Sequence, residues 1–394
     1  MVRTPLMTTP GAHLRICHIT PHLPPDQAAN ALLPAHLGQW AISAGHEVSF
    51  VAHPPRQSQG SPMIPATYLP SRHRDARVLG SLKLASLLEA MRIRRDVAPV
   101  VDRADIVHVH SNGLLAEAGG LLALSRGKPV VFTLYGTEIW HYRKKVGLDL
   151  FTRLYRRASR VAFYSGGLME HAIGAGLDRP GLSVVYPPVA DAFSFVDAGA
   201  QAALRAHLGV RARHLLVNVK RLHPLAGQRY LIEAMPGILA AHPDTHLVIC
   251  GTGQLKTDLE MRAQSLGVAR HITFTGLIPN QRVAQYVAAA DLFVLPSLLE
   301  ALPTVAIEAL ASGTPVVSAD HPGGVELHRL FGPDVAVVAR ERAPELAAAV
   351  AAALAVPRRT SPQTQVTLDA EFRPAVVLGR YLDLYRSAIT GRRR

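Results

Sequence analysis

The sequence feature that most constrains the fold is a regular alternation of short β-branched runs with amphipathic helical stretches. In the first half of the chain these runs are 14–19, 48–52, 106–109, 130–134, 161–164 and 184–186. The alternation stops near residue 187 and restarts with runs at 215–219, 247–250, 272–274, 292–295, 316–318 and 335–338. Apolar runs joined by helices are typical of parallel strands covered on both faces. The sequence therefore predicts an α/β protein with two doubly wound, Rossmann-like domains.

The chain length agrees with this organisation, because 394 residues fit two or three domains of about 100–200 residues. We expect an N-terminal domain at 1–195, a C-terminal domain at 196–372, and a last helix within 373–394 that crosses back to the first domain. Ligands of such proteins bind where the carboxyl ends of the two sheets face each other across a cleft.

Composition excludes several classes of protein. Hydrophobic residues make up 48% and charged residues 18% of the chain, which rules out global disorder. No stretch reaches the roughly 18–20 apolar residues of a membrane span, and no secretory signal is evident. Two cysteines, Cys17 and Cys250, exclude a disulfide framework and a cysteine-based metal site, and they fit a cytoplasmic protein.

The net charge of +13 has two interpretations. The favoured one is a solvated, arginine-rich surface, and the other is attraction to a polyanionic small molecule or an anionic membrane. Aromatic residues make up 6% of the chain, which argues against stacking on single-stranded nucleic acid, so no nucleic-acid partner is expected. The basic amphipathic stretch 81–95 permits shallow docking on the inner face of a membrane.

The most informative stretch is PSLLEALPTVAIEALASGTPVV at 296–317. A helix is expected to begin at Pro303, because proline is favoured at the first helical position. Leu302 before it offers no side-chain acceptor, so the amides of Thr304 and Val305 lack a partner. A helix N-terminus left open at the carboxyl edge of a sheet is suited to a phosphate.

Two carboxylates, Glu300 and Glu308, lie on either side of this helix start. Taken singly, each is best interpreted as an ordinary solvated charge. Beside an open helix N-terminus, Glu308 is placed to accept from hydroxyls next to a phosphate, such as those of a ribose. Glu300 is placed to accept from the hydroxyls of a sugar.

A second group of candidate residues follows the first strand of the second domain. Lys220 and Arg221 are placed to neutralise a diphosphate leaving group, which is electrostatic catalysis without a metal. Glycines after two further strands, at 251, 253 and 276, mark close approaches of the backbone.

The order of these motifs resembles family 4 of the glycosyltransferases, which are retaining enzymes with the GT-B architecture. The similarity runs from about residue 12 to 388 and is carried by R-L-x-P-x-x-G at 221–227, F-x-G-x-x-P at 274–279 and P-S-x-x-E-x7-E at 296–308. The first half adds G-H-E-V at 45–48, D-x-V-H-x-H at 105–110 and T-x-x-G-x-E at 133–138.

The resemblance implies a role for each candidate residue. Arg221 would contact the donor diphosphate, Glu308 the nucleotide ribose and Glu300 the transferred sugar. The sugar and the phosphate would be bound by the backbone of Leu302, Pro303, Thr304 and Val305. The loop around Gly276 and Leu277 would hold the base. The family needs no divalent metal, so neither a metal ligand nor a cofactor is expected.

The chain departs from the family pattern in three places. Ala226 stands where the family has a lysine, so Lys220 is expected to supply the missing charge. The loop after the first strand lacks the usual glycines, so Gln27 or a nearby amide is expected to approach the phosphate. Tyr135 stands where a histidine often meets the sugar or the acceptor. His110 is then the remaining cleft histidine, with a satisfied strand-end histidine as the alternative.

These features predict a metal-independent, retaining hexosyltransferase that moves a hexosyl or aminohexosyl unit from a UDP-sugar to a hydroxyl group. The expected acceptor is a small molecule, because 24–34 and 219–228 faintly resemble transferases of aminoglycoside antibiotic assembly. Asp26 and Glu138 would then bind a cationic aminocyclitol. The alternative acceptor is a membrane glycolipid or an envelope polysaccharide.

Two other functions stay open at this point. One is an epimerase or phosphorylase on the same scaffold, and the other is a non-catalytic protein that binds a nucleotide sugar. Release of UDP that depends on an added acceptor separates the transferase from both.

Overall fold

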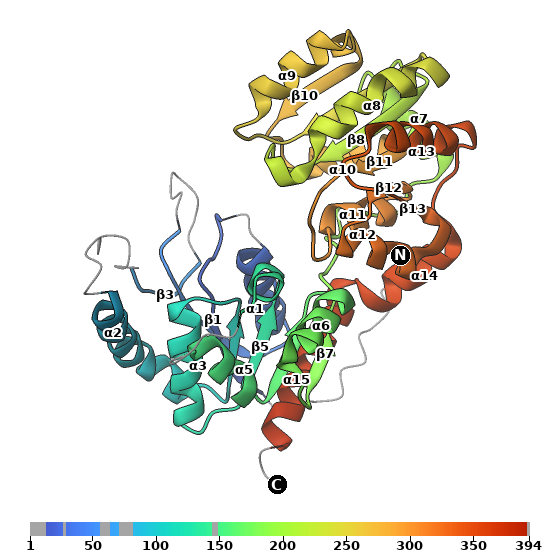
Figure 1. Cartoon of the computed structure of the whole chain (residues 1–394). Coiled ribbons are helices and arrows are strands. Elements are labelled where there is room, and N and C mark those ends of the chain that lie inside the picture. The colour runs from blue at the N-terminus through green and yellow to red at the C-terminus, as the bar shows by residue number, and fades with distance from the viewer. Residues whose placement is uncertain (1–12, 27–28, 56–63, 71–81, 144–148, 392–394) are drawn as a thin grey trace. The chain divides into compact units, whose positions relative to one another are not determined.

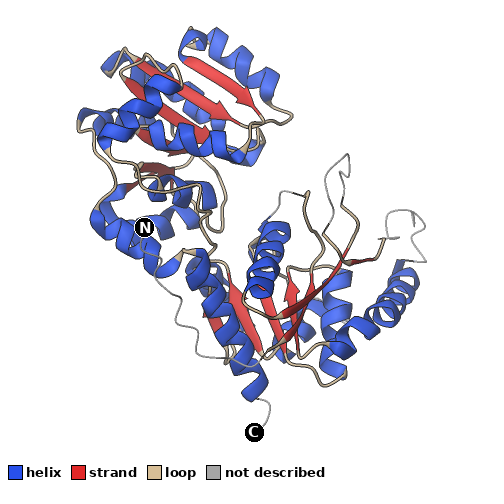
Figure 2. Cartoon of the chain, turned by 180° about the vertical axis from the view of Figure 1, so that it is seen from behind, coloured by secondary structure: helices blue, strands red, loops and turns tan. Residues whose placement is uncertain are grey.

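The computed structural model describes residues 13–26, 29–55, 64–70, 82–143 and 149–391. The chain divides into two compact units. The first unit contains Met1–Tyr164, Leu168–Val185 and Leu378–Arg394, and the second contains Ser165–Gly167 and Tyr186–Val377. Each unit is a parallel sheet with helices on both faces, as Figure 1 and Figure 2 show. The predicted fold class is therefore confirmed.

The first unit is built on a sheet in the order β3-β2-β1-β4-β5-β6-β7, in which neighbouring strands run parallel. The strands are β1 (Arg15–Ile19), β2 (Glu47–Ala52), β3 (Thr67–Tyr68), β4 (Ile106–His110), β5 (Val130–Leu134), β6 (Arg160–Phe163) and β7 (Leu182–Val184). The helices are α1 (Ala29–Ser43), α2 (Leu82–Arg103), α3 (Leu114–Ser125), α4 (Thr137–Trp140), α5 (Leu150–Arg157) and α6 (Gly166–Ala172). The direction of the strand order reverses between β1 and β4, which defines the switch point of this sheet.

The second unit repeats this plan in the order β10-β9-β8-β11-β12-β13. The strands are β8 (His214–Val219), β9 (Thr245–Cys250), β10 (Ile272–Gly276), β11 (Leu292–Leu295), β12 (Val316–Ala319) and β13 (Val335–Val338). The helices are α7 (Ala198–His207), α8 (Gln228–Ala241), α9 (Lys256–Ser265), α10 (Asn280–Ala289), α11 (Thr304–Ala311), α12 (Pro322–Phe331), α13 (Ala343–Ala355) and α14 (Pro362–Glu371). Here the strand order reverses between β8 and β11.

Apolar layers on both faces hold the second sheet in place. Val217 and Phe293 are buried in the layer on one face, and Leu216 and Val294 are buried in the layer on the other. Each such side chain contributes about 1.5–3 kcal/mol by leaving water. Consecutive strand residues thus face opposite apolar layers, which explains why the runs in the sequence are continuously apolar.

The last helix, α15 (Pro374–Thr390), belongs to the first unit from Leu378 onward. Its Tyr381 and Tyr385 are buried, and the Tyr385 hydroxyl lies 2.7 Å from His108 Nδ1 of β4. Arg160 of β6 donates to Ser387 Oγ at 3.1 Å. The chain therefore returns to the first unit at its C-terminal helix, drawn in red in Figure 1.

The units part at Val185 and Tyr186, earlier than the boundary that the sequence placed at 195/196. The reason is that Val189 and Phe193 are buried in the core of the second unit. The return to the first unit comes at Leu378, later than the predicted residue 373.

Some predicted element ends also shift. Strand β7 ends at Val184, where the sequence placed its start. The short strand β3 was not predicted, since two residues give no periodicity.

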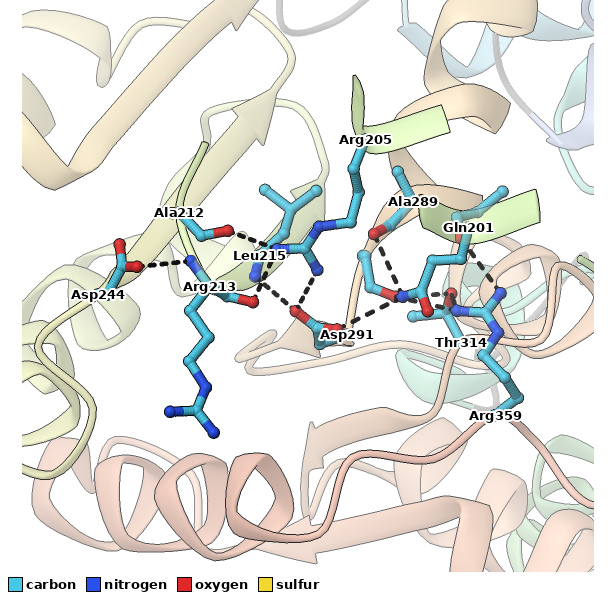
Figure 3. Close-up of polar contacts among 12 residues, drawn as sticks. Gln201, Arg205, Ala212, Arg213, Leu215, Asp244, Ala289, Asp291, Thr314 and Arg359 are labelled. Carbon is cyan, nitrogen blue, oxygen red and sulfur yellow. Dashed lines mark hydrogen bonds and ion pairs between the residues drawn. The ribbon is translucent and has the colours of Figure 1, made fainter. Parts of the chain in front are cut away.

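A polar network fixes the amino-terminal edge of the second sheet (Figure 3). The carboxylate of Asp291, directly before β11, accepts from the Leu215 amide and from Arg205 Nη1, each at 2.7 Å. Gln201 Nε2 of α7 donates to the carbonyl of Ala290 at 2.8 Å. The network thereby joins α7 to β8 and β11, at the edge opposite the carboxyl ends of the strands.

Arg359 adds a largely buried guanidinium to this edge. It donates to three backbone carbonyls at 2.9–3.1 Å, those of Val196, Ala288 and Ala290. Burial lowers the pKa of Arg359 to about 10, so the group stays charged at neutral pH. The guanidinium also donates to the carbonyl of Ser312 at 2.5 Å. The carbonyl of Ala290 has a second donor in Gln201, whereas no other side chain in the described residues donates to the carbonyls of Val196 and Ala288.

Replacing Arg359 by methionine should destabilise the second unit. The substitution leaves several carbonyls without a donor, and we expect the free energy of unfolding to fall by about 2–4 kcal/mol. Urea unfolding followed by circular dichroism measures this change. Arg386→Met is the control, because Arg386 forms an exposed pair with Asp383 on α15 worth less than about 0.5 kcal/mol. Equal unfolding midpoints for the two variants would contradict the role given to Arg359.

Candidate functional site

The candidate site lies at the switch point of the second sheet, where the loops after β8 and β11 separate. Lys220 directly follows β8, and Glu300 lies in the loop after β11. Their Nζ and Oε1 atoms are 2.5 Å apart, and the two side chains are 28% and 17% exposed. The structure thus brings together Lys220, which was predicted to bind the donor diphosphate, and Glu300, which was predicted to bind the sugar of the same donor.

Helix α11 begins at this point with unpaired amides. Its N-cap is Pro303, which has no side chain to accept from the first turn, so the helix starts one residue later than predicted. Within the described residues, no hydrogen bond is formed by the amides of Thr304 and Val305. Both residues are half-buried, while Leu302 and Pro303 are buried. The open amides and the helix dipole make this end a site for an anion.

Glu308 lies on α11 one turn beyond the open amides and is half-buried. No hydrogen bond or ion pair to its carboxyl is found in the described part of the chain. Burial alone raises the pKa of Glu308 to about 7. A buried carboxyl without a donor is unfavourable for stability, and hydroxyl donors of a ligand would relieve this cost.

Two glycines bring the neighbouring loops close to β8. A Cβ on Gly251 would lie 2.1 Å from the carbonyl oxygen of Lys220, and one on Gly253 would lie 2.1 Å from that of Leu222. The Gly251 amide also donates to the carbonyl of Gly276 at 2.9 Å. This contact places the loop with Leu277, which is 84% exposed, at the same edge as Lys220.

Arg221 is exposed beside Lys220, and none of the described residues pairs with its guanidinium. Ala226, where the family has a lysine, is 3% exposed in the short helix Pro224–Ala226. The cations that the described residues supply at the end of β8 are therefore Lys220 and Arg221.

The first sheet carries a different group at its own switch point. His18 of β1 and His110 of β4 are fully buried, with Nδ1 and Nε2 2.9 Å apart. His110 Nδ1 lies 2.8 Å from the hydroxyl of Tyr135, which follows β5. His110 was predicted as a cleft histidine, but its burial means that it reaches a ligand only through Tyr135. Sequence analysis missed His18; its signal was a histidine inside an apolar strand.

A third histidine, His108, packs against His110 with ring centroids 3.8 Å apart. Its two nitrogens lie 2.7 Å from the hydroxyls of Tyr385 and Thr133. The three histidines bring ligand atoms within 4.8 Å of one another. Protein groups already bond to every ring nitrogen of the three except His18 Nε2. This pattern fits a hydrogen-bond chain better than a metal centre.

The residues proposed for a cationic acceptor are engaged elsewhere. Asp26 lies 3.0 Å from His22 Nδ1. Glu138 is 5% exposed and accepts from the amides of Tyr135 and Gly136 at 2.8 and 3.1 Å. Both carboxylates therefore already bind groups of the protein. Gln27 lies outside the described residues.

With this geometry established, comparisons with known proteins identify the family. The family described as "Glycosyl transferases group 1" matches residues 203–364, and "Glycosyltransferase Family 4" matches residues 35–193. The chain belongs to the group 1 glycosyltransferases. The resemblance found from the motifs is therefore confirmed.

Two curated relatives of this group 1 glycosyltransferase share 32% identity with it over 63% of its length. One is the "GDP-mannose-dependent alpha-(1-6)-phosphatidylinositol monomannoside mannosyltransferase" of Mycolicibacterium smegmatis. The other is the "Putative teichuronic acid biosynthesis glycosyltransferase TuaC" of Bacillus subtilis. The matched stretches span 66% and 59% of these relatives, which is less than two thirds of their length.

A solved structure shows the same fold. Anabaena Alr3699/HepE in complex with UDP matches with a TM-score of 0.73 and 20% identity, over 95% of this chain and 100% of that one. The fold is therefore GT-B. In the described part of the chain, no helix is long and apolar enough to cross a membrane.

Glu308→Gln should stabilise the protein at alkaline pH. Because the pKa of Glu308 is raised in the folded state, protonation favours folding below the unfolded value, and this benefit is lost as pH rises through about 7. At pH 8 the free energy of unfolding of the variant should be about 3 kcal/mol higher than that of the wild type, and at pH 4 the two should agree. Urea titrations at both pH values measure this difference. Glu260→Gln is the control, because the Glu260 carboxylate lies at the surface in a helical pair with Lys256; it should change stability by less than about 0.5 kcal/mol at either pH. If E308Q is no more stable than the wild type at pH 8, the ionised Glu308 carboxylate does not destabilise the folded protein, and the interpretation given to its burial is wrong.

Proposed function

We propose that the chain transfers a glycosyl unit from a nucleoside-diphosphate sugar to a hydroxyl of a membrane glycolipid or an envelope polysaccharide. The observation that carries this proposal is the open amide end of α11 at the switch point of the second sheet. Cations follow the strand on one side of it and carboxylates lie on the other.

The donor diphosphate fits the cationic side of this site. The amides of Thr304 and Val305 would bind phosphate oxygens, aided by the helix dipole. The guanidinium of Arg221 would add bidentate, charge-assisted hydrogen bonds. As the bond to the sugar breaks, negative charge develops on the diphosphate, and these fixed donors would stabilise it. We propose that they replace a divalent metal, so activity should persist in EDTA.

The carboxylates fit the sugar nucleotide's hydroxyls. Glu308 has no hydrogen-bond donor among the described residues, and ribose hydroxyls would supply one. Glu300 pairs with Lys220 in the free protein. With donor bound, Glu300 would accept from the transferred sugar while Lys220 turns to the diphosphate, since Ala226 offers no charge. From the family resemblance we also propose that the transferred sugar retains its configuration at the anomeric carbon. NMR of the product, which distinguishes the two anomers, tests this.

The nucleotide base would bind at an exposed loop of the second unit. The exposed loop at Gly276 and Leu277 follows β10 at the same edge of the sheet as the start of α11 and is suited to hold it. The sequence resemblance favours a UDP-sugar, whereas the name of one relative contains GDP-mannose. We therefore propose UDP-sugars first and include GDP-mannose in the donor panel.

The relatives' names favour a lipid or polysaccharide acceptor over an antibiotic intermediate. One name refers to a phosphatidylinositol monomannoside and the other to teichuronic acid. Asp26 and Glu138, the two carboxylates predicted to bind a small-molecule acceptor, already bind protein groups, which also favours the glycolipid or polysaccharide acceptor.

Helix α2 offers a surface for such an acceptor's membrane. Leu87, Leu88 and Met91 on this helix are 50%, 58% and 59% exposed. Arg94 and Arg95, on the next turn, are also exposed. Exposed apolar side chains next to arginines are typical of shallow binding to anionic lipid.

Acceptor-dependent release of nucleoside diphosphate tests the proposed reaction. The assay combines each donor with a lipid extract or a polysaccharide primer, with and without EDTA. Arg221→Met should lower kcat/KM by about 10–100-fold, the loss of one or two charge-assisted hydrogen bonds. Arg270→Met is the matched control, because exposed Arg270 lies before β10 at the opposite edge of the sheet. Donor binding without turnover in any combination would favour a non-catalytic nucleotide-sugar protein, and full activity of R221M would overturn the site.

Vesicle co-sedimentation tests the acceptor class separately. The chain should bind vesicles with anionic lipid at low salt and lose this binding as salt is raised. Replacing Leu87, Leu88 and Met91 together by serine should weaken it several-fold while leaving donor binding unchanged. A matched triple variant at exposed Val356, Val366 and Met261 of the second unit should bind as wild type does. Equal binding to neutral vesicles and to anionic ones would argue against the membrane acceptor.

A further inference from the structure

The first sheet contains a hydrogen-bonded chain that ends at a hydroxyl on its carboxyl edge. The chain runs from His18 Nδ1 to His110 Nε2 at 2.9 Å, and from His110 Nδ1 to the Tyr135 hydroxyl at 2.8 Å. His18 and His110 are 0% exposed, whereas Tyr135 is half-buried. The chain therefore leads from the interior of the sheet to the edge where ligands of such folds bind.

Both histidines in the chain are neutral. Burial lowers the pKa of His18 to about 3. Burial, and after it the repulsion that a protonated His18 would exert, lowers the pKa of His110 well below its usual value. A neutral imidazole carries one proton, so each ring donates through one nitrogen and accepts through the other. All bonds of the chain consequently point the same way, either outward toward Tyr135 or inward toward His18.

The inner end of the chain selects the direction. His18 Nε2 is buried and has no hydrogen-bond partner in the described residues. In the inward direction this nitrogen would carry a proton, leaving a buried N–H without an acceptor. In the outward direction it is a bare acceptor, which proteins tolerate better than an orphaned donor. The outward direction is therefore preferred, with the protons on Nδ1 of both rings.

The outward direction determines what Tyr135 can do. Its oxygen accepts from His110, so its own hydrogen must go to another acceptor. Burial raises the pKa of Tyr135 well above its usual value, so the hydroxyl keeps this hydrogen. Across the described ranges of the chain, no protein acceptor bonds to the Tyr135 hydroxyl. The donor is consequently free for a ligand.

A strained backbone accompanies this chain. Ser111, directly after His110, has a left-handed φ of 59° and is 5% exposed. Its amide donates to the carbonyl of Thr133 at 2.9 Å. Such a conformation is strained for a residue other than glycine and is concentrated at functional sites. The turn at Ser111 ends β4 at His110. His110 thereby stays paired with Thr133 of β5, the strand that Tyr135 follows.

We propose that His18 and His110 are positioning residues that hold the Tyr135 hydroxyl as a hydrogen-bond donor to an oxygen of the carbohydrate substrate. The class of substrate in this statement depends on the proposed function, while the direction of the chain does not. His108 is outside the chain, because rotating hydroxyls of Tyr385 and Thr133 satisfy both of its nitrogens in either tautomer.

NMR of the full-length protein tests the direction without any assay of activity. Histidine side-chain ¹⁵N–¹H correlations distinguish Nδ1–H from Nε2–H rings, and His18→Phe and His110→Phe variants assign the signals. We expect the Nδ1–H tautomer for both rings, which is the form that free histidine disfavours. An Nε2–H signal from His110 would overturn the proposal, because Tyr135 would then donate inward.

Kinetics test the use of the hydroxyl. Tyr135→Phe should raise KM for one of the two substrates about 2–10-fold, the worth of one neutral hydrogen bond, with kcat within about twofold. His110→Phe should have the same effect, and the double variant should add nothing further. His110→Asn should restore KM, because its amide places an N–H near the position of Nδ1, whereas His110→Gln should not. Unchanged KM for both substrates in Y135F would overturn the proposed contact.

The two proposals fail in different ways. Nδ1–H tautomers in a protein that transfers no sugar would leave the hydrogen-bond chain intact and refute the proposed function. An Nε2–H tautomer of His110 in a protein that does transfer sugar would refute the proposed direction of the hydrogen-bond chain and leave the proposed function intact.

Discussion

The structure depends on one topological constraint, the reversal of strand order in each parallel sheet. At β8 and β11 this reversal separates two loops and leaves the start of α11 without neighbours to bond its first amides. The ion pair of Lys220 and Glu300 spans this gap in the free protein. On the proposed function, a diphosphate would meet unpaired N–H groups and two cations there, and the fold itself would supply the binding site without a dedicated loop.

The first sheet has different side chains at the point where its strand order reverses. Between β1 and β4 it holds neutral imidazoles in place of charges, because their full burial leaves no water to solvate a cation. A hydrogen-bond chain is the arrangement that such a dry environment tolerates, provided that each ring has a partner. The two units thus differ in chemistry: the second presents cations, carboxylates and open amides at its switch point, and the first holds buried imidazoles bonded to Tyr135, for which we propose the role of an oriented neutral donor.

The sequence predicted the local features of the site better than its contacts. The open end of α11 could be read from Leu302 and Pro303, since neither has an acceptor group. Lys220 and Glu300 were both found, but their pairing depends on β8 lying next to β11, which no local pattern encodes. The engagement of Glu138 was also missed, because a carboxylate in the first turn of a short helix caps nearby amides instead of facing solvent. His18 gave no signal beyond one polar residue in an apolar strand.

The central claim is that the amides at the start of α11 bind the diphosphate of a sugar nucleotide. Backbone ¹H–¹⁵N spectra of the labelled protein, titrated with UDP and with GDP, test it most directly. The account predicts large downfield shifts of the Thr304 and Val305 amides with the bound diphosphate, and no such shifts with the matching nucleoside. A nucleotide that binds while leaving these two amides unmoved would contradict it.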